Sequence, residues 1–340
     1  MMLSLRGHRT ELGPSEIAQG EPDRPGSPRE AYGTRQTVAK ALRLTLAIVF
    51  VLALVACKGG EQRFSGKRAL AHVKAQCDIG PRPVGSKANA KTVEYLTRVL
   101  ERYGWQVELQ SFAHEGMPVH NVIGTKGQGP LIVLGAHFDT RPVADKDPAD
   151  RSLPVMGAND GGSGTAVLLE LARVLGKRAT DQAQLKLVFF DAEDRGELGG
   201  WPWCVGSAYM AKSLAGTRPA YVIVMDMVGD DDQRIYYEWS STLWLEEKLW
   251  QIADQLGYKQ HFIPEHRYSI LDDHTSFLQW GMNAALIIDF DYPYWHTRYD
   301  TLDKISADSL QRVGDVLETL LEGEPFGPSP SGEMGSTHYP

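Results

Sequence analysis

The sequence predicts one α/β domain built on a mostly parallel, twisted central sheet with helices on both faces. Two observations predict this class. Short apolar runs typical of buried strands recur along the chain, and the clearest of them is 131–135. The segments between these runs carry apolar residues at helical spacing, as Leu168, Leu171 and Leu175 do within 162–175. Strands that alternate with helices favour a parallel sheet between two helix layers.

The expected elements follow one another through most of the chain. Helices are expected at 67–77, 86–103, 162–175, 207–214, 242–257, 275–280 and 306–321. Strands are expected at 105–112, 120–124, 131–136, 185–190, 221–225 and 284–288. The stretch 105–112 alternates as a half-buried strand does. Ser86 and Ser306 are expected to cap their helices, because a hydroxyl oxygen can accept a hydrogen bond from an N–H of the first turn.

The chain before this domain reads as an export segment. Residues 1–33 are polar and rich in Pro, Gly and Glu, so we expect them to be disordered, or the assigned start to be too early. Residues 34–57 contain basic residues followed by the apolar run 44–56. That run is shorter than the roughly 20 residues that cross a bilayer, and it is typical of a secretory signal.

The apolar run ends in Leu-Val-Ala-Cys, which resembles the bacterial lipoprotein processing box, with Cys57 as the lipidated residue. An ordinary signal peptide with an incidental cysteine is the alternative. The expected location is therefore the bacterial cell envelope, periplasmic or at the surface, with a lipid anchor in a membrane. A linker is expected at 58–66, the folded domain at 67–322 and a flexible tail at 323–340.

Charge and cysteine content exclude some classes. The net charge is −8 and no basic stripe is present, which excludes a nucleic-acid partner. The three cysteines are too few for a thiolate metal cluster or a disulfide framework. Whether Cys77 and Cys204 pair is left open by the sequence. We expect a monomer.

Acidic residues and histidines follow the expected buried strands. In chain order they are His137 and Asp139, Asp160 in the glycine-rich segment 157–164, Glu193 and Asp194, Asp226, and His296. Ligand sites gather at the carboxyl ends of parallel strands. Several carboxylates at one such edge repel each other unless a cation compensates, and histidines with carboxylates favour zinc over calcium or magnesium. A structural alternative exists for Asp160, which could cap a helix.

These residues lie in motifs that resemble a known family. AHFDT, GANDGGSGTAVLLELARVL, LVFFDAED, VIVMDMVGD, LDDHTSFL and YPYWHT occur in the order and spacing of the zinc-dependent metallopeptidase family 28. The resemblance covers about 66–320 and implies a zinc exopeptidase-like fold. That family includes dizinc aminopeptidases and glutaminyl-peptide cyclotransferases.

The resemblance implies a role for each matching residue. Asp160, Asp194 and His296 would hold the catalytic Zn²⁺. His137 and Asp226, with Asp160 as the bridge, would hold a second Zn²⁺ in a dizinc enzyme, whereas a cyclotransferase keeps these residues and works with one. Glu193 would be the general acid and base, and Asp139 would orient His137. The chain departs from the family in having Glu-Asp where Glu-Glu is usual, which makes Asp194 the least secure ligand.

Three further features favour a cyclotransferase, which cyclises the N-terminal glutamine of peptides or proteins. Trp295 precedes His296, and Asp272 opens a segment similar to the cyclotransferase DDH motif, in which it would join an acid network with Asp226. The run 191–194, followed by 203–207, resembles bacterial cyclotransferases, and Trp201 or Trp203 would help to wall the pocket. Trp295 as a core aromatic and Asp272 as a helix cap are the structural alternatives. A dizinc aminopeptidase, or an inactive peptide-binding surface lipoprotein, are the other functions to be weighed.

Overall fold

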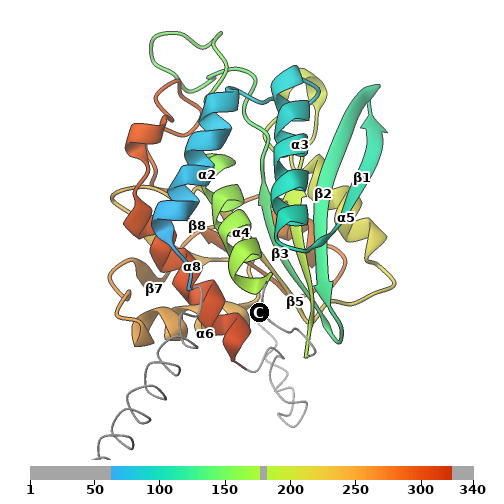
Figure 1. The fold of residues 1–340 in the computed structure, drawn as a ribbon. Helices are drawn as coiled ribbons and strands as arrows, with labels where there is room; N and C mark the ends of the chain where they lie inside the picture. The colour runs from blue at the N-terminus through green and yellow to red at the C-terminus, as the bar shows by residue number, and fades with distance from the viewer. Residues whose placement is uncertain (1–62, 177–181, 324–340) are drawn as a thin grey trace, which may run out of the picture. The chain divides into compact units, whose positions relative to one another are not determined.

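The computed structural model describes residues 63–176 and 182–323. A six-stranded sheet with the order β1-β2-β4-β3-β5-β8 lies at its centre (Figure 1). The strands are β1 Gln106–His114, β2 Met117–Gly127, β3 Leu131–His137, β4 Gln184–Phe190, β5 Tyr221–Asp226 and β8 Ala284–Ile288. β4, β3, β5 and β8 run parallel, and the β1–β2 hairpin is added antiparallel to β4. The predicted class, a mostly parallel sheet in one α/β domain, is confirmed.

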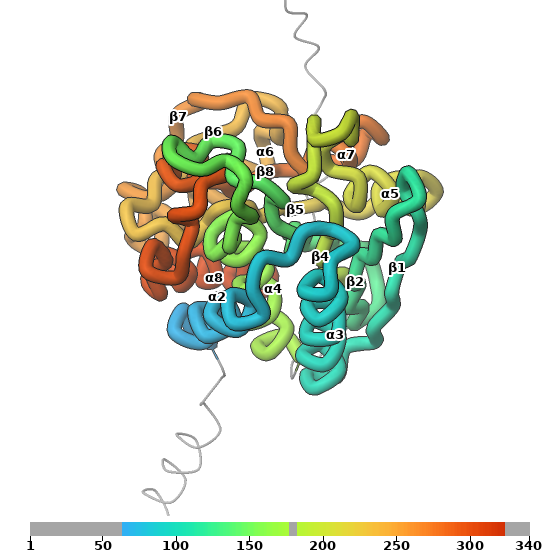
Figure 2. Tube along the Cα trace, turned by 90° about the horizontal axis from the view of Figure 1, so that it is seen from above, coloured from blue at the N-terminus to red at the C-terminus, as the bar shows by residue number. Residues whose placement is uncertain are grey.

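Helices cover both faces of the sheet (Figure 2). α2 Gly66–Ile79, α3 Lys87–Arg102, α4 Gly162–Leu175 and α8 Ala307–Glu322 lie on one face, and α5 Val205–Ser213 and α7 Asp273–Leu278 on the other. Alternate strand residues enter the two cores: Ile132 and Leu134 pack with the first set of helices, and Leu131 and Val133 with the second. All residues of α4 are buried, as expected for a helix that is apolar on most sides.

A second, two-stranded sheet was not predicted. It pairs β6 Ile235–Glu238 with β7 Phe262–Tyr268, and α6 Leu243–Gln255 connects the two strands. β7 contains Pro264 and several exposed polar residues, and the pairing has register shifts, so neither an apolar run nor a regular alternation marks these strands. The predicted caps are confirmed: Ser86 accepts a hydrogen bond from the N–H of Asn89, and Ser306 from that of Asp308.

The folded domain begins earlier than predicted. Residues 64–66, assigned to the linker, are packed: α2 starts at Gly66, and Phe64 is 4% exposed. The backbone N–H of Phe64 donates to Glu318 Oε2 at 2.8 Å. Residues 1–62, with the apolar run 44–56 and Cys57, lie outside the described part of the chain, as do 324–340.

Cys77, half-buried on α2, and Cys204, buried before α5, are both free thiols, so they do not pair with each other. Within 63–176 and 182–323, no helix has the length and apolar character needed to span a bilayer.

Candidate active site

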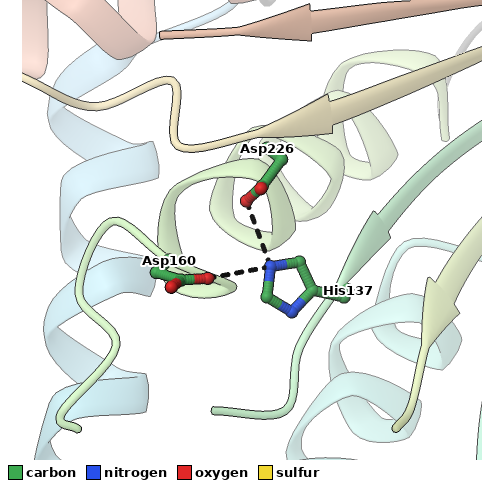
Figure 3. Close-up of side chains that lie close together, drawn as sticks. All are labelled: His137, Asp160 and Asp226. Carbon is green, nitrogen blue, oxygen red and sulfur yellow. Dashed lines mark hydrogen bonds and ion pairs between the residues drawn. The ribbon is translucent and has the colours of Figure 1, made fainter. Parts of the chain in front are cut away.

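The first cluster of potential metal ligands consists of His137, Asp160 and Asp226. His137 is the last residue of β3, Asp226 is the last residue of β5, and Asp160 precedes α4. Figure 3 shows both carboxylates pointing at one nitrogen of the histidine: Nε2 lies 3.0 Å from Asp226 Oδ1 and 3.2 Å from Asp160 Oδ1. All three side chains are buried, so the parallel strands bring these residues together at one edge of the sheet.

The second cluster consists of Asp160, Asp194 and His296. His296 Nε2 lies 3.0 Å from Asp194 Oδ1 and 3.7 Å from Asp160 Oδ2. The two oxygens of Asp160 therefore face two different histidines, and this residue belongs to both clusters. The structure thus gathers all five residues that the sequence singled out as ligands, including Asp194 with its shorter side chain.

Both clusters suit a cation. Both carboxylate oxygens of Asp194 are buried, and neither accepts a well-aligned hydrogen bond from the described residues. Burial, followed by the neighbouring Asp160 carboxylate, raises the pKa of Asp194 to about 7. Burial alone would lower the pKa of His296, but Asp194 and Asp145 outweigh it and raise the pKa to about 9. Imidazole nitrogens and carboxylate oxygens at such distances are the donor set that zinc prefers.

Glu193 lies beside these clusters and is buried. Its Oε2 is 3.9 Å from His137 Nδ1, and its Oε1 accepts a hydrogen bond from the Cys204 thiol at 3.5 Å. Burial raises the pKa of the Glu193 carboxyl well above its usual value. That direction suits a group that takes up a proton during a reaction.

Asp139 contacts the site differently from what the sequence suggested. Its Oδ1 lies 3.6 Å from His137 Nδ1, which is too long for a hydrogen bond. Instead, its two oxygens accept hydrogen bonds from the backbone N–H groups of Glu193, at 3.1 Å, and of Asp194, at 3.2 Å. Asp139 therefore fixes the turn that carries both the candidate base and a candidate ligand.

Sequence reasoning missed Asp300, which holds the segment that carries Asp160. Its carboxylate accepts hydrogen bonds from the backbone N–H of Asn159 at 2.8 Å, from that of Asp160 at 3.1 Å, and from the Tyr292 hydroxyl at 2.8 Å. Burial, and then the Asp160 carboxylate, raise the pKa of Asp300 to about 7. Nothing in the stretch after His296 distinguishes this aspartate from an ordinary loop residue.

Two arginines, also missed, hold the loops around the site. The buried Arg82 guanidinium donates to the carbonyl oxygens of Phe138, Met156 and Gly157 at 2.6, 3.0 and 2.7 Å. Arg141 donates to the Asp194 carbonyl at 3.1 Å and to Asp145 Oδ2 at 2.6 Å. The other oxygen of Asp145 lies 3.2 Å from Nδ1 of His296. This last carboxylate is placed to orient the ring of a ligand histidine.

The backbone is strained where it carries the site. Ala192, Met227 and His296 have φ values of 59°, 44° and 58°, in the left-handed region that non-glycine residues avoid. Each such residue costs about 1–2 kcal/mol. Ala192 precedes Glu193, Met227 follows Asp226, and His296 is itself a candidate ligand. Such strain is commonly retained at functional sites.

A pocket of about 180 Å³ opens onto the clusters. Five of its lining residues carry the acidic and imidazole groups: Asp160, Glu193, Asp226, Asp272 and His296. The rest of the wall is mainly apolar and includes Trp203, Trp295, Phe290, Ile288 and Ile270. The Trp203 ring stacks on His296 with 6.0 Å between ring centroids and 14° between planes.

Only some of the residues predicted to line the pocket do so. Trp295 and Trp203 line the pocket, whereas Trp201 is buried in a separate apolar cluster with Val84, Val119 and Val205. Asp272 fits both of its interpretations, because it caps α7 through the N–H of Asp273 and also lines the pocket. Burial, and then the Asp226 carboxylate, raise the pKa of Asp272 to about 7.

Known proteins resemble this chain in sequence and fold. The model of the family described as Peptidase family M28 matches residues 119–321 of this chain. Aminopeptidase YwaD of Bacillus subtilis is 27% identical over 63% of this chain and 46% of its own length, so the chain spans about half of that relative. The crystal structure of Porphyromonas gingivalis glutaminyl cyclase matches with a TM-score of 0.72 and 34% identity, covering 76% of this chain and 98% of that one. A leucine aminopeptidase precursor from Bacteroides thetaiotaomicron also has a TM-score of 0.72, with 31% identity over 77% and 98% of the two chains.

Proposed function

From the premise that this chain belongs to peptidase family M28, we propose that it is a zinc-dependent glutaminyl-peptide cyclotransferase. It would convert the N-terminal glutamine of a peptide or protein to pyroglutamate and release ammonia. Its likeness to a glutaminyl cyclase over 98% of that chain supports this proposal.

The observation that carries the proposal is the size and lining of the small pocket. Its volume, about 180 Å³, suits a single side chain, and Trp203, Trp295 and Phe290 make its wall apolar. Such a wall excludes water from the bound residue. Exclusion of water matters because hydrolysis of the side-chain amide competes with its attack by the peptide's own amine.

The residues of the pocket can divide the reaction among them. A zinc ion held by Asp160, Asp194 and His296 would supply Lewis-acid polarisation of the side-chain carbonyl. Glu193 accepts a proton from the α-amine as its nitrogen bonds to the δ-carbon. Glu193 then returns that proton to the side-chain nitrogen, whose bond to the δ-carbon breaks, and ammonia leaves. Asp272, which lines the same pocket, holds a carboxyl with a raised pKa that can donate a hydrogen bond to the oxygen where charge develops.

A dizinc aminopeptidase is the second candidate, and one observation favours it. Asp160 faces both histidines, which is the arrangement that a carboxylate bridging two metal ions needs. The likeness to a leucine aminopeptidase precursor points the same way. The number of zinc ions bound per chain separates the candidates, since one supports the cyclotransferase and two support the aminopeptidase.

The deciding experiment uses the zinc-loaded protein with one peptide that begins in glutamine and one that begins in leucine. Loss of ammonia from the first peptide, seen by mass without shortening, supports the cyclotransferase. Release of free leucine from the second would refute it. Glu193→Gln is expected to abolish either reaction, whereas Glu197→Gln, which changes an exposed residue of the same loop, should leave it intact.

We also propose that the protein is exported and anchored through a lipid on Cys57. The support is the basic and apolar sequence at 34–57, because these residues lie outside the described structure. Labelling with a fatty acid in a bacterial host should mark the wild-type protein and leave Cys57→Ala unlabelled. Equal labelling of the two would refute the proposal.

A further inference from the structure

A second hollow lies beside the candidate active site. It has a volume of about 630 Å³ and lies between β1, α5 and α7. Trp203 and Leu271 line both this hollow and the active-site pocket, so the two adjoin each other. Cys204, whose thiol contacts Glu193, also lines it. We call it the side groove. Nothing in the chemistry assigned to the pocket above uses it.

The side groove has an apolar floor and rim. The Phe112 and Tyr209 rings stack with 3.9 Å between centroids and 4° between planes, which gives a flat aromatic surface. Tyr209 is 43% exposed and Leu271 is 61% exposed, although both are large apolar side chains. Exposed apolar groups around a hollow are typical of a site that receives a ligand.

The charge of the side groove contrasts with that of the pocket. Lys212 lines it, whereas its described lining contains neither aspartate nor glutamate. This contrast is marked because the whole chain carries a net charge of −8 and because five acidic or imidazole side chains line the adjoining pocket. The side groove therefore favours a ligand group that carries a carboxylate, whereas the acidic side chains of the active-site pocket disfavour one.

We propose that the side groove binds the part of the peptide substrate that follows its N-terminal residue. An apolar side chain of the peptide packs against Phe112, Tyr209 and Leu271, and a carboxylate of the peptide pairs with Lys212. That carboxylate belongs to an acidic side chain or to the C-terminus of a short peptide. The preferred substrates are thus peptides with an apolar residue and an acid shortly after the N-terminal residue. This inference rests on the proposal that the protein acts on peptide N-termini.

The test compares kcat/KM for four substrates on the zinc-loaded enzyme. Gln-Gly-amide ends before the groove, and Gln-Ala-Phe-Asp-amide carries an acidic side chain. Gln-Ala-Phe-Asn with a free C-terminus carries only the terminal carboxylate, and Gln-Ala-Phe-Asn-amide carries neither. Wild type should prefer either peptide with a carboxylate to the neutral one, and the better of the two identifies the source of the carboxylate.

Two groove variants and one control complete the design. Lys212→Glu should lower kcat/KM for the preferred peptide about five- to tenfold, through a higher KM. Tyr209→Ala should lower it about tenfold. Neither variant should change kcat/KM for Gln-Gly-amide. The control is Lys91→Glu, which reverses the charge of an exposed residue on α3, at the opposite face of the sheet. It should change kcat/KM for neither the preferred peptide nor Gln-Gly-amide. The inference is overturned if wild type treats the four substrates alike, or if the variants affect Gln-Gly-amide as much as the longer peptides.

The outcome for the groove is separable from the outcome for the cyclotransferase. If the enzyme removes the N-terminal residue instead of cyclising it, the same comparison is made on that hydrolysis. Calorimetric binding of the same peptides to the Glu193→Gln protein needs no turnover, and it should reproduce the preference for a carboxylate and its loss in a Lys212→Glu background. Equal affinities for the acidic and neutral peptides would overturn the inference whatever reaction the enzyme performs.

Discussion

The strongest stability prediction concerns Gly314 in the middle of α8. A Cβ at this position would lie 2.2 Å from Cδ1 and Cε1 of Phe64 and 2.4 Å from its Cγ. Gly314→Ala should gain about 1 kcal/mol from helix propensity. It must also displace a buried ring, which costs about 1–3 kcal/mol for overpacking and up to about 3–5 kcal/mol if the ring leaves its site. The net effect we expect is a destabilisation of roughly 1–3 kcal/mol.

A double-mutant cycle of Gly314→Ala and Phe64→Ala tests whether the clash with the Phe64 ring causes this destabilisation. Urea unfolding followed by circular dichroism, at saturating zinc, gives the free energy of unfolding of wild type, both single variants and the double variant. In a Phe64→Ala background the clash is gone, so Gly314→Ala should become neutral or stabilising by up to about 1 kcal/mol. The same loss in both backgrounds, or a stabilising effect of Gly314→Ala alone, would refute the packing of Phe64 on α8 and with it the early start of the domain.

Three more predictions concern pH, metal binding and the loops of the site. Burial, and then the nearby Glu238 carboxylate, raise the pKa of Glu246 from 4.5 to about 8, so the folded chain keeps a proton there that the unfolded chain releases. The free energy of unfolding should therefore fall as pH rises between these values, by roughly 1–3 kcal/mol, and Glu246→Gln should remove this fall whereas exposed Glu247→Gln keeps it. Asp160→Asn should reduce the zinc content measured by elemental analysis below that of wild type whether one or two ions bind, and an unchanged content would contradict its place in both clusters. Arg82→Met should lower the free energy of unfolding by about 3–5 kcal/mol, since two buried carbonyls and one partly buried carbonyl lose their donor, and a melting temperature equal to that of wild type would contradict this.

The sequence predicts an element well where burial is one-sided or complete. The expected bounds of 162–175 and 284–288 are those of α4 and β8, because an entirely buried segment leaves a continuous apolar signal. β6 and β7 gave no such signal. They are partly exposed, and one contains a proline, so their pairing depends on α6 and β8 packing beside them rather than on their own pattern.

The same distinction holds at the site. His137 and Asp226 could be predicted because parallel strands end at one edge, so a residue at a strand end has a known position. Asp300 and Asp145 act from loops, and no local pattern fixes where a loop residue points. Asp139 shows the limit of a spacing argument: the extended segment ends at His137, so its carboxylate turns towards another strand end.

Asp139 accepts hydrogen bonds from two successive peptide N–H groups, which limits how the candidate base can move. One carboxylate thus holds the backbone of both Glu193, the candidate base, and Asp194, a candidate ligand. In the proposed cyclotransferase, Glu193 would therefore carry the proton from one nitrogen to the other by rotation about its side-chain bonds. The proposed proton transfer would then need no movement of the backbone that carries Glu193 and Asp194.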